Sequence, residues 1–285
     1  KLLREMVGRR KENYSLAPVY LTTFYREGVQ LKNKFQSLTE AVFKVYKAPL
    51  QEVNTSDQVK LLKMSRIDNR ESTDSLVAKM RAGIQACLQL DFIKDLPDFL
   101  SVDARDNQYV YTSGDITFID DRCVNVVYFE QKPDVKGPLY CGALYIDSEN
   151  GALVQVRIEI QQAQKVNLTT QKVVYTISYK PWNGTYYIHH IRGDLYFKMK
   201  RKRVFFSNPT LHTWFEMVTC LVDKENVTRF PRAERLPTRT VLADEEFRYD
   251  EHFWEDFNII PLEEELSKII EKVALKIEKI GPQEE

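Results

Sequence analysis

The sequence lacks the short motifs that mark the best-known classes of enzyme and nucleotide-binding protein. It contains no G-x-S-x-G nucleophile elbow, no H-E-x-x-H zinc motif, no Walker loop and no G-x-G-x-x-G fingerprint. Serine, histidine and aspartate residues are present, but nothing in their order suggests a catalytic triad. We therefore expect no enzymatic activity, no catalytic residue and no cofactor.

Cysteine is scarce, with only Cys87, Cys123, Cys141 and Cys220 in 285 residues. None of these residues has the C-x-x-C spacing of a thiolate zinc site. In the hairpins predicted below, no two cysteines lie opposite each other. We expect four buried thiols and no structural disulfide.

The chain has no excess of charge of either sign, because 41 basic residues balance 41 acidic ones. A net charge near zero gives no overall attraction to nucleic acid, and we expect no nucleic-acid partner. No apolar run approaches the roughly 18–20 residues needed to cross a bilayer, so no transmembrane segment is expected. The chain begins in a helix-like stretch without a leader, which we interpret as the mature or trimmed portion of a longer protein.

Strand patterns dominate what the sequence does contain. Residues 152–161 give the clearest one, because Val154, Val156, Ile158 and Ile160 alternate with polar residues, as in a half-buried strand. Short turns such as Asn150-Gly151 and 181–184 separate further strands, which predicts antiparallel pairing in a meander. The other predicted strands are 20–29, 38–46, 58–64, 109–117, 123–131, 139–147, 172–179, 186–199 (with a bend at Gly193) and 211–222.

Helical patterns are few. Residues 75–90 carry apolar side chains at helical spacing, and 91–100 extend or follow this segment, which predicts a helical insertion near 75–100. Residues 261–280 predict a C-terminal helix, with Pro261 in the first turn, an apolar stripe and Gly281-Pro282 after its end. The sequence therefore predicts one mainly β (α+β) domain over residues 1–285. We expect a large curved antiparallel sheet or incomplete barrel with a few helices.

Four segments carry a resemblance to a known family: 20–27 (YLTTFYRE), 38–42 (LTEAV), 138–147 (PLYCGALYID) and 253–260 (FWEDFNII). They resemble a largely uncharacterised region of Bacteroidetes envelope proteins. In that family the region typically follows a carboxypeptidase-regulatory-like domain. The resemblance implies an exported protein of the periplasm or outer membrane, and it transfers no catalytic motif.

The pattern Gly-x-Leu-Tyr-Ile-Asp at 142–147, followed by a turn and an alternating strand, is also similar to LolA/LolB-like lipoprotein-localisation proteins. That resemblance implies an incomplete barrel that shelters acyl chains on a concave apolar face.

Aromatic residues on consecutive predicted strands give the candidate ligand-binding set. They either fill the core or line an apolar groove under a curved sheet. The candidates are Tyr175, Tyr179, Trp182, Phe197, Trp214 and Phe215.

A basic run gives a candidate anion-binding set, because alternation places Lys198, Lys200 and Lys202 on one face. The run either projects past the core as a hairpin end or binds phosphate head groups or an acidic glycan. The short Asp-Ser-Leu pattern at 74–76 matches an O-glycosylation pattern of that bacterial group, which would imply export.

Metal binding is not expected. His189 and His190 are strand neighbours and point to opposite faces, so both cannot easily ligate one ion. The carboxylates at 244–246, 250–251 and 255–256 match no EF-hand spacing and are typical of a solvated loop.

Two functional hypotheses follow from these patterns. The leading one is an exported, non-enzymatic envelope protein whose concave sheet binds an apolar or amphipathic ligand such as a lipid or a lipoprotein acyl chain. The alternative is an interaction module that holds an envelope protein or a glycan by its outer face or loops.

Overall fold

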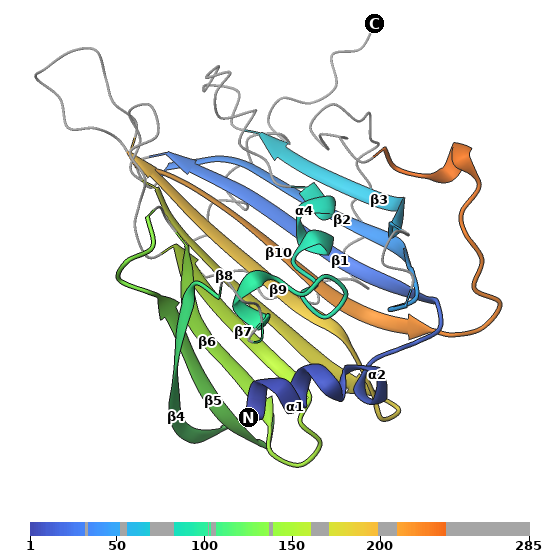
Figure 1. Ribbon diagram of the computed structural model, residues 1–285. Helices are drawn as coiled ribbons and strands as arrows, with labels where there is room; N and C mark the ends of the chain where they lie inside the picture. The colour runs from blue at the N-terminus through green and yellow to red at the C-terminus, as the bar shows by residue number, and fades with distance from the viewer. Residues whose placement is uncertain are drawn as a thin grey trace, which may run out of the picture. The chain divides into compact units, whose positions relative to one another are not determined.

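A ten-stranded antiparallel sheet organises the computed structural model of this chain (Figure 1). Everything described belongs to one compact unit within residues 1–247. The structure describes residues 1–31, 34–51, 56–68, 83–101, 103, 107–136, 139–160, 171–198 and 210–237. The predicted C-terminal helix 261–280, the acidic segments at 244–256, the Ser75 pattern, Lys200 and Lys202 lie outside these residues.

All ten predicted strands are confirmed, most of them one to four residues longer than the patterns indicated. Their bounds are β1 Val19–Leu31, β2 Lys34–Lys47, β3 Gln58–Asp68, β4 Tyr109–Ile119, β5 Arg122–Gln131, β6 Tyr140–Asp147, β7 Leu153–Ile160, β8 Gln171–Trp182, β9 Thr185–Lys198 and β10 Thr210–Asp223.

The strand order is β3-β2-β1-β10-β9-β8-β7-β6-β5-β4. Every neighbouring pair except β1 and β10 is consecutive in the chain. After β3 at one edge, the chain crosses to begin β4 at the other edge. The antiparallel pairing of β1 with β10, for example Phe24 opposite Val218, joins the two meanders into one sheet.

The sheet curves around one of its faces (Figure 1). Bulges or irregularities interrupt the register on both sides of β1, between β2 and β3, and in three pairs of the β4–β9 meander. Each bulge inserts extra backbone on one strand, which bends that strand and increases its twist. Strands of up to 14 residues with this added twist produce the predicted curved, open sheet.

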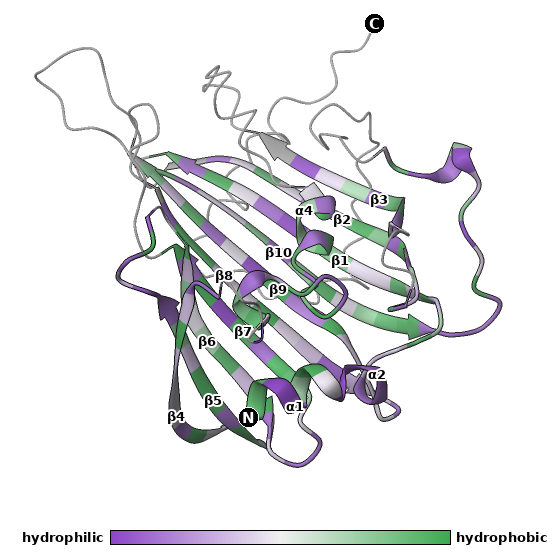
Figure 2. Ribbon diagram, viewed as in Figure 1, coloured by the Kyte–Doolittle hydropathy of each residue, from purple (hydrophilic) through white to green (hydrophobic). Residues whose placement is uncertain are grey.

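Short helices and loops cover the concave face (Figure 1). They are α1 (Leu2–Gly8), α2 (Arg10–Asn13), α4 (Gly83–Gln89) and the 3-10 turn η1 (Asp98–Leu100), while the 3-10 turn η2 (Arg232–Glu234) follows β10. Met6, Ile84 and Phe99 reach from this cover into a continuous apolar cluster with the strands, and each is almost fully buried. Hydrophobic and hydrophilic residues alternate along the strands, as expected for a sheet with one core face (Figure 2).

Three sequence predictions need correction. Among the described residues of the predicted 75–90 helix, only 83–89 are α-helical, and residues 91–100 form turns that end in η1. The four-residue turn at 181–184 is a two-residue turn, because Asn183 and Gly184 both have positive φ and the strands run up to them. β9 continues through Gly193, where the missing side chain leaves room for the Phe215 ring.

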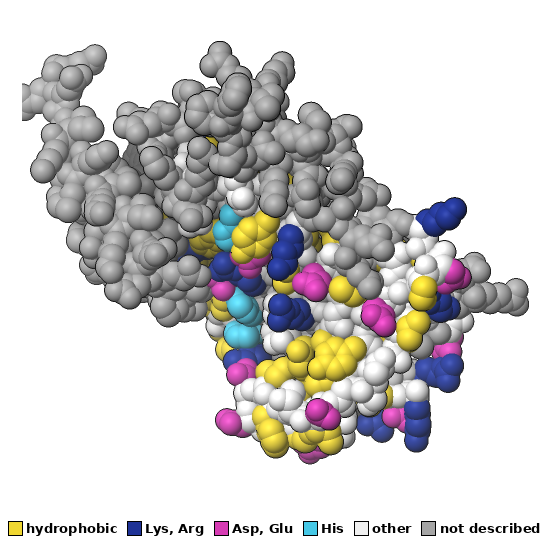
Figure 3. Space-filling view, turned by 90° about the vertical axis from the view of Figure 1, so that its left-hand side faces the viewer, with side chains coloured by type: hydrophobic (Ala, Val, Ile, Leu, Met, Phe, Trp, Pro, Cys, Tyr) yellow, Lys and Arg dark blue, Asp and Glu magenta, His cyan; other side chains and the backbone are white. Residues whose placement is uncertain are grey.

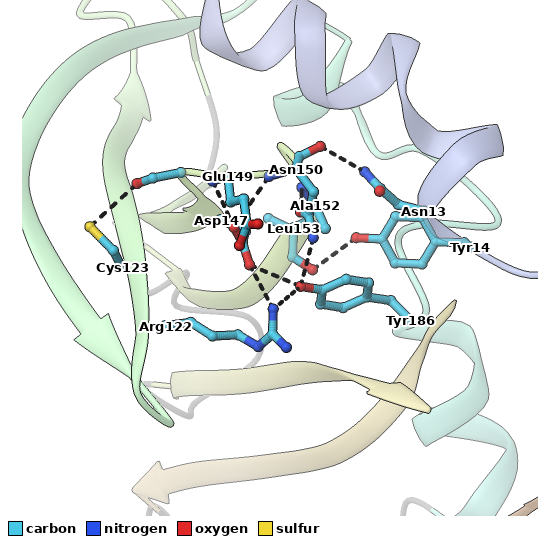
Figure 4. A network of polar contacts seen from close by, with 11 residues as sticks. Asn13, Tyr14, Arg122, Cys123, Asp147, Glu149, Asn150, Ala152, Leu153 and Tyr186 are labelled. Atoms are coloured by element: carbon cyan, nitrogen blue, oxygen red, sulfur yellow. Dashed lines mark hydrogen bonds and ion pairs between the residues drawn. The ribbon is translucent and has the colours of Figure 1, made fainter. Parts of the chain in front are cut away.

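A hydrogen-bond network joins the start of β5, the end of β6 and the start of β9 (Figure 4). Asp147, at the end of β6, accepts hydrogen bonds from the Tyr186 hydroxyl at 2.9 Å and from Arg122 Nη1 at 3.0 Å. Its other carboxylate oxygen accepts the Glu149 backbone N–H at 2.8 Å and so shapes the β6–β7 turn. Burial alone would raise the pKa of Asp147, but these hydrogen bonds outweigh it and hold the pKa below its ordinary value.

Candidate functional site

One cross-strand row of residues runs over the face of the sheet opposite the core. Residues that pair directly across strands point to the same side of a sheet, so the row shares one face. We call it the polar row: Ser65, Glu40, Arg26, Glu216, Arg192, Thr176, Arg157, Ala143, Tyr128 and Thr112, from β3 to β4.

Within the β2–β1–β10–β9 part of the polar row, the charged side chains are paired with each other. Arg26 Nε lies 2.6 Å from Glu40 Oε1, and Arg192 Nη1 lies 3.6 Å from Glu216 Oε2. Glu216 also contacts His190 Nε2 at 2.6 Å. Burial alone would raise the pKa of Glu216, but His190 and Arg192 lower it overall. The charged side chains in this part of the face are therefore already paired with one another.

The next row along the strands contains a second paired cluster. Asp194 accepts a hydrogen bond from Arg192 Nε at 3.0 Å and lies 2.9 Å from His212 Nε2. Trp214 lies beside it, with the Arg192 guanidinium 4.8 Å from the ring centroid. A Cβ on Gly28 would meet the Trp214 ring at 2.6 Å, so only glycine leaves room for this ring.

The β4–β7 part of the same face contains an open groove of about 580 Å3. Such a volume falls within the roughly 300–1,000 Å3 range of small-molecule sites. Seen from the side of β4–β6, this face brings hydrophobic, charged and histidine side chains close together (Figure 3). The groove is lined by Thr112, Tyr128, Phe129, Glu130, Cys141, Gly142, Ala143, Tyr145, Arg157, Ile158 and Glu159.

The charged groups of the groove, Arg157, Glu130 and Glu159, differ from the charged residues of the polar row on β2, β1, β10 and β9, because they form no ion pairs with one another. Within the part of the chain that the structure describes, Arg157 and Glu130 make no hydrogen bond or ion pair. Glu159 receives only a long contact from Cys141 Sγ, at 4.0 Å. One guanidinium and two carboxylates are therefore free to contact a ligand.

Tyr128 provides a fixed aromatic surface at the edge of the groove. It is 51% exposed. A Cβ on Gly114 of β4 would lie 2.6 Å from its ring, so the ring rests against the glycine backbone. A ring held in this way loses little conformational freedom when a ligand stacks on it.

Cys141 lies in the groove but is a poor candidate nucleophile. Burial raises the pKa of its thiol, and the nearby carboxylates of Glu159 and Glu130 raise it further. Because the thiolate is the reactive form, a raised pKa makes this cysteine a weaker nucleophile at neutral pH.

Over the main core, the concave face is filled in the part of the chain that the structure describes. The cavity lined by Tyr14, Leu21, Ile93, Tyr179 and Ile188, among others, has a volume of only about 40 Å3. That volume holds about one water molecule and no acyl chain. The apolar groove predicted under the sheet is thus occupied by core side chains along most of β5 to β9.

The six predicted ligand-binding aromatics do not form one site. Tyr175, Tyr179 and Phe215 belong to or pack against the core, and Phe197 belongs to a smaller apolar cluster with Val29 and Leu211. Trp214 lies on the opposite face, because it precedes Phe215 in the same strand. Trp182 is exposed at the end of β8.

A ring of buried charges lies beside the small cavity. Lys47 Nζ contacts Asp57 and Asp91, each at 2.6 Å, and Lys94 Nζ lies 2.8 Å from Asp57. Tyr179 donates a hydrogen bond to Asp91 at 3.2 Å. These pairs attach the 91–94 segment of the cover to the sheet.

The remaining predicted sites are not assembled in the described part of the chain. Lys198 is the last residue of β9, and Lys200 and Lys202 lie outside the described residues. Among described side chains, no cluster of three His, Cys, Asp or Glu groups is placed to hold a metal ion. No described helix is long and apolar enough to span a membrane.

The sequence analysis missed the groove residues Tyr128, Glu130, Arg157 and Glu159. A signal was available, because Arg157 and Glu159 occupy the polar side of the clearest strand pattern, 152–161. Tyr128 and Glu130 of β5 come close to Arg157 and Glu159 only through the order of the strands in the sheet.

Comparison with known proteins gives distant likenesses of fold. No protein-family model and no curated protein sequence matches the chain. One similar structure is a domain from Vibrio parahaemolyticus described as an outer membrane lipoprotein-sorting protein, with 10% identity, a TM-score of 0.33 and coverage of 80% of this chain and 93% of that one. Another is lipovitellin, at 9% identity and a TM-score of 0.35 over 79% of this chain but 27% of that one.

A DUF1329 family protein from Desulfovibrio piger is also similar, at 8% identity and a TM-score of 0.30, covering 77% of this chain and 92% of that one. The predicted resemblances to LolA-like proteins and to Bacteroidetes envelope proteins both stay predictions. TM-scores of this size leave the function to be inferred from the chain's own residues.

Proposed function

We propose that this chain is a non-enzymatic binding protein that holds a neutral oligosaccharide in the groove across β4–β7. The observation that carries the proposal is the unpaired state of the charged groups there. Elsewhere on the polar row the arginines and carboxylates neutralise each other, whereas Arg157, Glu130 and Glu159 have no comparable partners among the described residues.

The lining chemistry favours a sugar. A sugar ring carries hydroxyl groups that both donate and accept hydrogen bonds, together with an apolar C–H surface. Carboxylates accept such bonds and a guanidinium donates several, so Glu130, Glu159 and Arg157 supply complementary groups. The exposed Tyr128 ring supplies a flat apolar surface with a polar tip.

The groove favours neutral over acidic sugars because two carboxylates face one guanidinium. An acidic glycan would bring a further negative charge next to Glu130 and Glu159, where like charges repel. This differs from the predicted binding of anions by the Lys198 run, which stays a separate prediction.

Binding without catalysis is part of the same proposal. The raised pKa of the Cys141 thiol removes the obvious nucleophile from the groove. Placement in the bacterial envelope is also part of it, and the support for that placement is the resemblance of 138–147 and the other quoted segments to envelope proteins.

Isothermal titration with a panel of neutral oligosaccharides tests the proposal. We expect saturable binding by at least one of them, weakened at least tenfold, about 1.4 kcal/mol, by Tyr128→Ala or Arg157→Ala. Ala143→Trp should abolish binding, because Ala143 is buried in the lining and a bulky ring would fill the groove. Leu221→Ala, at an exposed position of β10 outside the groove lining, is the matched control and should bind normally.

Failure of every neutral oligosaccharide to bind, or binding that survives Tyr128→Ala and Arg157→Ala unchanged, would rule out the groove as a sugar site.

A second candidate function is binding of an apolar ligand on the concave face. The observation that favours it is the smaller apolar cluster of Val29, Phe197 and Leu211, with Leu31 packed against it and Leu195 in contact with both this cluster and the main core. Saturable binding of a fluorescent fatty acid, lost in a Leu195→Trp variant that melts like the native protein, would support this function. Lack of saturable binding by native protein would exclude it.

A further inference from the structure

The two edges of the sheet differ in whether another segment of the described chain covers them. At the β3 edge, the backbone N–H of Leu236 donates a hydrogen bond to the Val59 carbonyl at 2.7 Å. The N–H of Phe230 donates to Gln58 Oε1 at 2.9 Å, and Glu234 forms an ion pair with Lys60. The segment after β10 therefore covers part of the β3 edge.

The β4 edge has no strand beside it among the described residues, and its side chains are unusually apolar. Ile116 is 62% exposed and Phe118 is 71% exposed. Proteins normally protect such an edge with lysine, proline or a covering segment, because unpaired backbone groups accept another strand. Residues 116–119 contain no charge and no proline.

The bulge around Gly114 and Asp115 divides β4 into two parts. The first part, with Thr112, borders the groove, and the second part carries the exposed Ile116 and Phe118. Because a bulge bends a strand, the second part is a short, separate pairing surface.

We propose that residues 115–119 of β4 pair with the same residues of a second copy of this chain, antiparallel and about a twofold axis at Thr117. In this register Ile116 lies opposite Phe118 of the second copy, and Phe118 lies opposite Ile116. All four side chains fall on one face, since positions two apart on a strand share a face. Thr117 faces Thr117, a pair that also stabilises antiparallel strands.

The sequence of this segment indicates that the strand pairing with it is the same segment of a second copy of the chain. A twofold interface requires that one patch complement itself. Here both apolar residues meet apolar partners, and the sole carboxylate of the strand, Asp115, meets Ile119 rather than another Asp115. The inference does not depend on the ligand of the groove, although pairing at β4 would place the two grooves on the same face of a continuous sheet.

Sedimentation velocity across the micromolar range tests the pairing on the full chain. We expect a dimer for the native protein and a monomer for Ile116→Lys and Phe118→Lys. Both variants should keep the native circular-dichroism spectrum, since the side chains are largely exposed in a single chain. Their melting temperature is compared with that of the native protein diluted until it is a monomer, because dimer formation itself raises the melting temperature. Val110→Lys is the control, because Val110 is an exposed apolar residue of the same strand outside the paired segment; this variant should remain a dimer.

The register is tested by Thr117→Cys under mild oxidation, with the linked peptides identified by mass spectrometry. A disulfide between two copies of position 117 is expected, and Val110→Cys should give none. A native protein that sediments as a monomer at every concentration overturns the proposal. A dimer that survives Phe118→Lys, or crosslinks that exclude position 117, likewise overturns it.

Discussion

Glycine at Gly28, Gly114 and Gly193 has the same role at three places in the sheet. In each case an aromatic ring of a neighbouring strand occupies the space where a Cβ would lie, 2.4 to 2.6 Å from the nearest ring atom. Strand glycines usually weaken a sheet, but here they allow large rings to lie flat against the backbone. Trp214, Tyr128 and Phe215 owe their orientations to these glycines.

Gly193→Ala should therefore destabilise the protein by roughly 1–3 kcal/mol, because the new methyl group would overlap the Phe215 ring. The free energy of unfolding from urea titration measures this effect. Gly8→Ala is the control, because a Cβ at Gly8 meets nothing within 4 Å and alanine favours the helix. Equal stability of the two variants would contradict the role given to Gly193.

Asp147 makes the stability of the protein depend on pH. Its pKa in the folded protein lies below the ordinary value, so its contribution is present above the unfolded pKa and is lost as the pH falls through the folded pKa. Asp147→Asn should reduce the slope of unfolding free energy against pH in the acid range. Part of the dependence of unfolding free energy on pH should remain in that variant, because the pKa values of Asp57, Asp194 and Glu216 are also lowered. An unchanged slope would contradict the assignment.

The cover of the concave face is attached to the sheet by polar as well as apolar contacts. α4 and the turns after it contribute Ile84, Cys87 and Phe99 to the core, while the buried carboxylate of Asp91 contacts Lys47. Burial alone would lower the pKa of Lys47, but Asp91 and Asp57 raise it overall, so the ammonium stays charged. The ion pair of Asp91 with Lys47 forms only when the cover is docked on the sheet, so it stabilises the docked arrangement.

Lys47→Met should destabilise the protein strongly, by roughly 3–5 kcal/mol, because it leaves the carboxylates of Asp57 and Asp91 buried with fewer partners. The double variant Lys47→Met/Asp91→Leu should recover part of that loss. Arg4→Met is the control, since its pair with Asp103 is well exposed and should contribute only about 0–1 kcal/mol. Chemical denaturation of the four proteins compares them, and similar losses for Lys47→Met and Arg4→Met would contradict this account.

The layering of the cover on the sheet predicts unequal reactivity of the cysteines. All four are free, and Cys87 lies fully buried between α4 and the sheet, where burial raises the pKa of its thiol. Cys123, Cys141 and Cys220 are only partly buried. The cover over Cys87 must open before a reagent reaches it.

Titration with a thiol reagent should therefore label three cysteines in the native protein and the fourth only on unfolding. Peptide mapping identifies which thiol is protected. Finding fewer than four thiols in unfolded, unreduced protein would mean that a disulfide exists. Rapid labelling of Cys87 in the native protein would mean that the cover opens freely.

At the scale of the whole molecule, the sequence by itself determined the strands and the antiparallel curved sheet. Apolar and polar residues alternate along 152–161 and most other strands, and this pattern depends only on neighbours in the chain. The sequence could not show which face would be covered. Alternation along the strand already separates Trp214 from Phe215, but only the structure shows that Phe215 is the one on the core side.

Only the tertiary structure decided where the candidate site lies. Arg157 and Tyr128 are brought together by the pairing of β5, β6 and β7, and the β1–β10 pairing joins residues 19–31 to residues 210–223. It also decided that the concave face would be filled by α4 and its neighbours rather than left open. The physical reason is that alternation fixes which residues share a side of one strand, whereas strand order and the cover arise from contacts between distant segments, which local patterns do not encode.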